Sequence, residues 1–145
     1  MNLDKAAAVI EVASELGEIE AIKNFLKKNL QALPVTDEEH FQIELALIEI
    51  CLNIIHYAYP ENRGTIQVKF WTEGPQVFLE IRDKGVPFDP SQSPTPDIED
   101  LIRKRKKGGL GIYLSRELMD GFAYRRDGDQ NILLMHKKLS GAGEN

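Results

Sequence analysis

The sequence predicts an α+β fold, a two-layer sandwich in which a mostly antiparallel mixed sheet carries helices on one face. Three observations lead to this prediction. Two long helical patterns come first, two hairpin patterns follow them, and a further helical pattern lies between the hairpins. The 145 residues contain no internal repeat and suit a single domain over residues 1–145 with one core.

The first half of the chain contains the two long helical patterns. Residues 6–13 fit either a short strand or the start of a helix, and the run alone does not decide. From Ser14, a candidate cap, apolar residues recur on one helical face until Pro34. A second helix follows, from a cap at Thr36, through acids in its first turn, to a stop at Pro60.

Alternating apolar residues then predict two strands. Residues 65–71 and 76–81 each place their large apolar side chains on one side, and the turn at residues 73–75 between them indicates a hairpin. A stretch rich in Pro and Ser and then in basic residues follows, over residues 83–109. A loop of this length is normally functional or disordered.

The last part of the chain predicts one more helix and one more hairpin. The helix covers residues 110–120, and the hairpin covers residues 122–139 with its turn at Asp127-Gly128-Asp129. We expect the tail, residues 140–145, to be frayed.

Composition excludes several classes of protein. The net charge of −5 is not that of a general nucleic-acid binder. Cys51 is the only cysteine, so no internal disulfide can form and a reducing cytoplasm is expected. No apolar run approaches the ~20 residues of a membrane span, and the N-terminal stretch carries acids where a signal peptide carries bases.

A narrow polar stripe crosses the second helix, which is otherwise apolar. At about 100° per residue, Gln42, Glu49, Asn53 and His56 fall within a band roughly 60° wide, with the small Ala46 at its edge. One interpretation is a solvated stripe on an amphipathic helix. The other is a site, because a carboxylate can accept a proton and an amide oxygen is a hard ligand suited to Mg²⁺.

Asp83 and Gly85 form a second candidate feature, at the end of a predicted strand. An acid there can accept a hydrogen bond from an exocyclic amine, while glycine lets the backbone approach a flat ligand. The alternative is an Asx-type turn, which these residues also favour.

A third feature is the group of glycines at the start of the third helix, Gly108, Gly109 and Gly111. Backbone N–H groups at such a position can converge on phosphate with help from the helix dipole, although a flexible hinge has the same composition. The basic run 103–107 fits a solvated charge cluster or a nucleotide contact, and the acidic balance elsewhere argues against DNA.

Taken in order, these features resemble the GHKL ATPase superfamily, which includes gyrase, histidine kinases, a class of heat-shock chaperones and mismatch-repair ATPases. The resemblance extends over residues 6–139 and is greatest to the stand-alone anti-sigma-factor serine/threonine kinases of bacteria. It rests on "EICLN" as the N motif, "DKGVPFDP" as the first glycine motif, "GGLGIYLSRELMD" as the second, and the closing "YRRDGDQNILLMHKKL".

The resemblance implies roles for the residues of the first two motifs. It makes Glu49 the general base, Asn53 the Mg²⁺ ligand and Asp83 the residue that reads the adenine amine. Gly85 would help to shape the adenine pocket, and His56 would be a structural neighbour.

The second glycine motif implies contacts with the phosphates of ATP. Its nucleotide-binding positions would be Lys107, Gly108, Gly109, Leu110 and Gly111. The segment 89–107 is similar to the lid that covers the nucleotide in the family. Lys107 departs from the common pattern, which has glycine there, so the hinge is stiffer or the lysine itself reaches phosphate.

Within the superfamily, the sequence shows neither the phosphorylatable helix pair of histidine kinases nor the transducer domain of gyrase-like members. The resemblance therefore implies an ATP- and Mg²⁺-dependent kinase that phosphorylates a serine or threonine on an anti-anti-sigma (STAS-domain) partner. A sigma factor and a second copy of the chain stay open as further partners, and neither nucleic acid nor membrane is expected. The alternative is a nucleotide-sensing module that regulates a partner without transferring phosphate.

Overall fold

A computed structural model describes residues 8–59, 64–87 and 115–141 of the chain. The elements, in chain order, are β1 (Ala8–Ala13), the 3₁₀ turn η2 (Leu16–Glu18), α1 (Ile19–Leu30), α2 (Asp37–Tyr57), β2 (Thr65–Glu73), β3 (Gln76–Asp83), β4 (Gly121–Asp127) and β5 (Gln130–Lys138).

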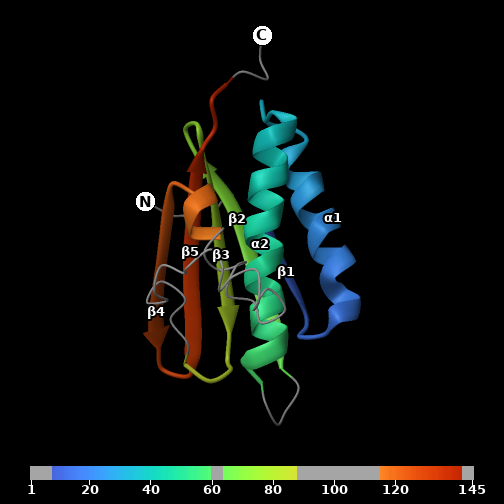
Figure 1. Cartoon of the computed structure of the whole chain (residues 1–145), viewed down its shortest axis with the longest axis vertical. Helices are drawn as coiled ribbons and strands as arrows, with labels where there is room; N and C mark the ends of the chain where they lie inside the picture. Colours follow the sequence, from blue (N-terminus) through green and yellow to red (C-terminus); the bar gives the residue numbers. More distant parts are fainter. Residues whose placement is uncertain (1–7, 60–63, 88–114, 142–145) are drawn as a thin grey trace, which may run out of the picture.

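The strands form a five-stranded sheet in the order β1-β2-β3-β5-β4, and all four described pairings are antiparallel. Helices α1 and α2 lie side by side (Figure 1). Their apolar residues share one core with those of the sheet. The predicted α+β sandwich is confirmed. The second hairpin joins the sheet through β5 rather than β4, so β5 lies beside β3.

The apolar face predicted for the first helix is the face that α1 buries. Ile22, Leu26 and Leu30 are fully buried between α1, α2 and the sheet. The predicted cap at Ser14 is wrong, because a 3₁₀ turn intervenes and α1 begins at Ile19 without a side-chain cap. The Ser14 hydroxyl is instead buried, with no hydrogen-bond partner within the described residues.

Helix α2 begins where its sequence predicts. Thr36 accepts a hydrogen bond from the Glu39 backbone N–H at 3.0 Å, and the Glu39 carboxylate accepts one from the Thr36 backbone N–H at 3.0 Å. This reciprocal arrangement satisfies two N–H groups that the first turn would otherwise leave unpaired. The second oxygen of Glu39 accepts from the Ser140 backbone N–H at 2.8 Å, which ties the start of α2 to the chain after β5.

Residues 8–13, which fitted either element, form a strand because they pair with β2 along their whole length. Both predicted hairpins are present. Their turns contain Gly74 and Gly128 with φ values of +57° and +61°, a conformation that glycine adopts at little cost.

Residues 115–118 are helical, in agreement with the end of the predicted third helix. The predicted lid, residues 89–107, and the glycine-rich positions 107–111 lie outside the described residues. Within the described part, no helix combines the length and the apolar character that a bilayer-spanning segment needs.

Candidate functional site

A pocket of about 420 Å³, including its open mouth, lies between the C-terminal half of α2 and the sheet where β3 ends and β5 begins. The enclosed part of the pocket is small, about 40 Å³, and the rest is open to solvent. Its walls are largely apolar, with a few polar groups. The lining residues are Ile50, Asn53, Ile54, Tyr57, Ala58, Ile81, Asp83, Val86, Tyr124, Asn131 and Leu133.

Asp83, the last residue of β3, supplies the carboxylate of this pocket, and its side chain is buried, with 6% exposed. Its Oδ1 accepts two hydrogen bonds, from the Gly85 backbone N–H at 2.8 Å and from Asn131 Nδ2 at 2.9 Å. Its Oδ2 accepts no hydrogen bond from the described residues. An acceptor that no described residue engages is suited to accept a hydrogen bond from a ligand in the pocket.

The loop after Asp83 is held on both sides by hydrogen bonds. The Lys84 N–H donates to the Tyr59 hydroxyl at 2.7 Å, and the Val86 N–H donates to the Ala58 carbonyl at 2.8 Å. A Cβ atom at Gly85 would lie 2.2 Å from that same carbonyl oxygen, so only glycine allows the loop to pack against the end of α2. The predicted Asp-x-Gly feature therefore closes one end of the pocket.

Glu49 and Asn53 lie on the same face of α2, one helical turn apart, and both are half-buried. Neither side chain forms a hydrogen bond or ion pair with the described residues. Asn53 lines the pocket together with Asp83, whereas Glu49 lies one turn farther from the Asp83 end. The structure thus brings Asn53, Asp83 and Gly85 together and places Glu49 next to them. His56 is exposed and does not line the pocket.

Burial dominates the electrostatics of both acids. It raises the pKa of Glu49 above its usual value. Burial also raises the pKa of Asp83, although the hydrogen bonds from Asn131 and Gly85 and the nearby charge of Arg126 oppose the shift. Such shifts are common where a protein uses carboxylates for chemistry or recognition.

Replacing Glu49 by glutamine should stabilise the protein at neutral pH. A carboxyl group whose pKa is raised by folding binds its proton more tightly in the native state, so stability falls as the pH rises through that range. The amide avoids this cost, and we expect the free energy of unfolding to increase slightly at pH 7. Urea denaturation at neutral pH and at about pH 4 tests this, because the gain should shrink in acid. An equal gain at both pH values would contradict it.

Asn131 is a site residue that the sequence did not predict, and it lies opposite Asp83 in the register of β3 and β5. The sequence does contain one signal for Asn131, a polar residue in an alternating apolar pattern. Asn131, Leu133 and Met135 alternate toward the core, and the first of them is polar. A polar residue at an inward strand position needs a buried partner, and here the partner is 48 residues away in the chain.

These groups fit an adenine nucleotide with Mg²⁺. The apolar walls suit a flat base, and Oδ2 of Asp83, which accepts from no described residue, suits an exocyclic amine. The described residues contain no cluster of three or more His, Cys, Asp or Glu side chains that could hold a metal by themselves. A single amide ligand such as Asn53 is nevertheless adequate for Mg²⁺, which usually keeps several waters and binds phosphate oxygens.

The fold and the pocket define an α+β domain with a site suited to a nucleotide, and comparison with known proteins gives the family. The family model of the histidine kinase-like ATPase domain matches residues 12–137. The chain belongs to this family, which confirms the resemblance to the GHKL superfamily.

Curated relatives include the serine-protein kinase RsbW of Bacillus cereus and of Bacillus anthracis. Each is 30% identical over 96 residues, an alignment that covers 63% of this chain and 60% of the relative. The chain therefore matches less than two thirds of the length of these relatives, and the relationship is distant.

Two solved structures show the same fold at low sequence identity. The SiaB–SiaC complex from Pseudomonas aeruginosa matches with a TM-score of 0.59 and 16% identity, over 90% of this chain and 88% of that chain. The histidine kinase domain of the blue-light activated histidine kinase from Erythrobacter litoralis matches with a TM-score of 0.53 and 17% identity, over 88% and 62%.

Proposed function

We propose that this chain is an ATP- and Mg²⁺-dependent protein serine/threonine kinase that acts as an anti-sigma regulatory factor, with a STAS-domain protein as its substrate. The observation that carries the proposal is the arrangement at the pocket. Asp83 lines an apolar slot with an oxygen, Oδ2, that accepts from no described residue. Asn53 and Glu49, whose side chains also have no partner within the described residues, follow along α2.

The base of ATP would lie in the slot between α2 and the sheet, with its exocyclic amine donating to Asp83 Oδ2. This orientation directs the phosphates along α2 toward Asn53, whose side-chain oxygen would hold Mg²⁺ together with phosphate oxygens. The metal, when bound, screens the charge that phosphoryl transfer moves between oxygens. We assign the remaining phosphate contacts to the segment Lys107, Gly108, Gly109, Leu110 and Gly111, and the lid to residues 89–107.

Glu49 would act as the general base. Its partial burial raises its pKa and makes the carboxylate a better proton acceptor than a solvated one. From one turn along α2 it would take the proton of a serine or threonine hydroxyl that attacks the γ-phosphate, while the leaving group is ADP. The new phosphate ester then carries about −1.5 to −2 charge. A kinase with a net charge of −5 repels such a product, which favours its release.

Two features support a protein substrate. The curated relatives are named serine-protein kinases, and one of the solved structures of this fold is a complex between two proteins. The STAS partner, the sigma factor and self-association belong to this proposal and come from the family resemblance.

The direct test is a transfer experiment. The protein is incubated with ATP and Mg²⁺ and, in turn, with each STAS protein of its own genome, and intact masses are then measured. One STAS protein should gain the mass of a single phosphoryl group, and its variant without the acceptor hydroxyl should gain none. If ATP binds and no STAS protein is modified, the chain is a nucleotide-sensing module rather than a kinase of this class.

A further inference from the structure

The side chain of Asn131 uses its whole hydrogen-bonding capacity inside the protein. It is buried, with 6% exposed. Its Nδ2 donates to Asp83 Oδ1 at 2.9 Å and to the Val86 carbonyl at 2.9 Å, and its Oδ1 accepts from the Tyr124 hydroxyl and from Arg126 at 3.2 Å. A primary amide has two hydrogens and two lone pairs, so no group of Asn131 is left for a ligand.

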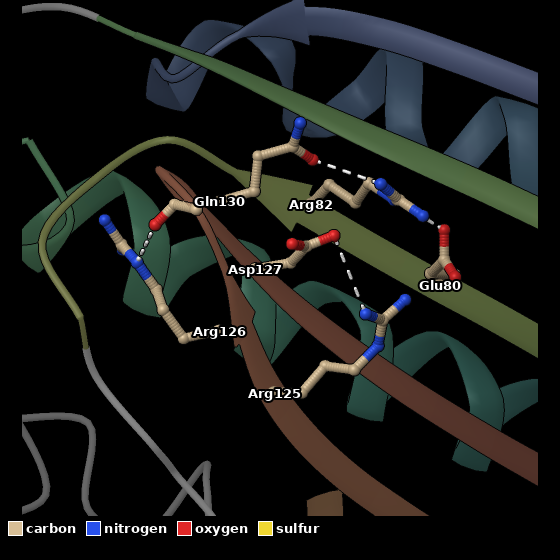
Figure 2. A network of polar contacts seen from close by, with 7 residues as sticks. Glu80, Arg82, Arg125, Arg126, Asp127 and Gln130 are labelled. Atoms are coloured by element: carbon tan, nitrogen blue, oxygen red, sulfur yellow. Dashed lines mark hydrogen bonds and ion pairs between the residues drawn. The ribbon is translucent and has the colours of Figure 1, made fainter.

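Arg126 determines which way the Asn131 amide points. A guanidinium group only donates, so the atom that faces it is the amide oxygen, and the NH₂ group faces Asp83. Arg126 also donates to the Gly85 carbonyl at 2.8 Å and to the Gly128 carbonyl at 3.1 Å. It therefore connects the β4–β5 turn, Asn131 and the loop after Asp83, and Figure 2 shows it reaching back to that turn.

The backbone N–H groups of residues 84–86, at this end of the pocket, are also engaged. The N–H groups of Lys84, Gly85 and Val86 donate to Tyr59, Asp83 and Ala58, respectively. Together with the two hydrogens of Asn131, every backbone N–H of residues 84–86 and both amide hydrogens of Asn131 are already used. What the Asp83 end offers a base is one acceptor, Asp83 Oδ2, and no donor from these groups.

We propose that Asn131, held in orientation by Arg126 and Tyr124, is a positioning residue that makes the pocket select a purine with an amine at position 6 over one with a carbonyl there. An amine donates to Asp83 Oδ2, whereas a carbonyl oxygen faces that carboxylate with no donor between them. This inference rests on the proposed nucleotide site and specifies its base selectivity.

The test compares two neighbouring arginines of β4. Arg126 belongs to the positioning network, whereas Arg125 points to the other side of the strand, is 61% exposed and lies 3.8 Å from Asp127 in an exposed ion pair (Figure 2). Arg126→Met and Arg125→Met are therefore a matched pair, because both make the same substitution at adjacent positions of β4. Calorimetry with Mg²⁺ measures the affinities for ATP and for inosine triphosphate, which has the carbonyl.

Wild-type protein should prefer ATP over inosine triphosphate by about 100-fold or more, and Arg126→Met should reduce this ratio about tenfold. Arg125→Met should leave both affinities unchanged. Asn131→Leu, which keeps the branched shape and removes the side-chain hydrogen bonds, should reduce the ratio further. Because Asn131 is buried, its variant is used only if its circular dichroism matches that of the wild type. If it does not match, the variant of the exposed Arg126 decides the test.

The ratio of the affinities for ATP and inosine triphosphate is a readout that a purely structural role of Asn131 would not change. If Arg126→Met keeps the wild-type ratio, or if wild-type protein binds both nucleotides equally, the selectivity inference is overturned while the nucleotide site stands. If wild-type protein binds neither nucleotide at millimolar concentration, the proposed function itself fails.

Discussion

Replacing Asp83 by asparagine should weaken ATP binding by about 30- to 1000-fold and leave the fold intact. The two shapes are nearly identical, and the amide oxygen can keep the hydrogen bonds from Gly85 and Asn131 to the Oδ1 position. The amide NH₂ then takes the Oδ2 position and faces the amine of adenine, donor against donor. Losing a hydrogen bond to a charged group and leaving a buried donor unpaired costs about 2–4 kcal/mol in total.

Calorimetric titration with ATP and Mg²⁺ measures this loss, and the unfolding temperature of the variant serves as its control. The pH dependence gives a second readout. Because burial raises the pKa of Asp83, wild-type affinity should fall as the pH decreases through that range, since protonation converts Oδ2 into a donor. The variant, which has no carboxyl group at this position, should lack this component. Unchanged affinity in a folded Asp83→Asn variant would refute the assignment of Asp83 to the base.

Replacing Glu49 by glutamine should lower phosphate transfer by about 10²- to 10⁴-fold while nucleotide affinity changes little. Removing a general base has an effect of this size, and an amide cannot accept the proton of the attacking hydroxyl. Glu49 does not line the pocket that Asn53 and Asp83 share, so the base of ATP loses no contact. The variant should also be the more stable protein at neutral pH, which separates loss of chemistry from loss of folding.

Asn53→Ala is the companion variant, because it removes the side chain one turn away that we assign to Mg²⁺. It should bind ATP with the same affinity whether Mg²⁺ or a chelator is present, whereas wild-type protein and Glu49→Gln should bind ATP more tightly with Mg²⁺. Calorimetry under both conditions, together with a transfer assay, distinguishes the two roles. Equal binding losses in the Glu49 and Asn53 variants would mean that Glu49 has a structural role.

Much of the fold could be predicted because its signals are local. Thr36 and Glu39 identify the start of α2 through a reciprocal cap, and alternating residues with a Gly128 turn identify the last hairpin. Residues 8–13 could not be assigned, since only pairing with β2 makes them a strand. The cap predicted at Ser14 failed because a 3₁₀ turn delays the helix, and no local pattern distinguishes that start from a capped one.

The site also contains residues that local patterns predict and one that they do not. Glu49 and Asn53 share a helical face, and Asp83 precedes Gly85 by two residues, so helical periodicity and a short motif were sufficient to find them. Asn131 depends on strand register, which brings together residues 48 positions apart in the chain. Its importance lies in contacts that no short window of sequence contains.

The hydrogen-bonded loop at residues 84–86 has a consequence for the entropy of binding. Ordering the backbone of a residue costs about 1–2 kcal/mol, and a binding site that orders its loops on ligation loses that amount from its affinity. Here the N–H groups of the loop are engaged by Tyr59, Asp83 and Ala58 without any ligand. Little conformational freedom is left for a base to remove. The Asp83 end of the pocket is thus a fixed template, and a change of shape on nucleotide binding has to arise elsewhere in the chain.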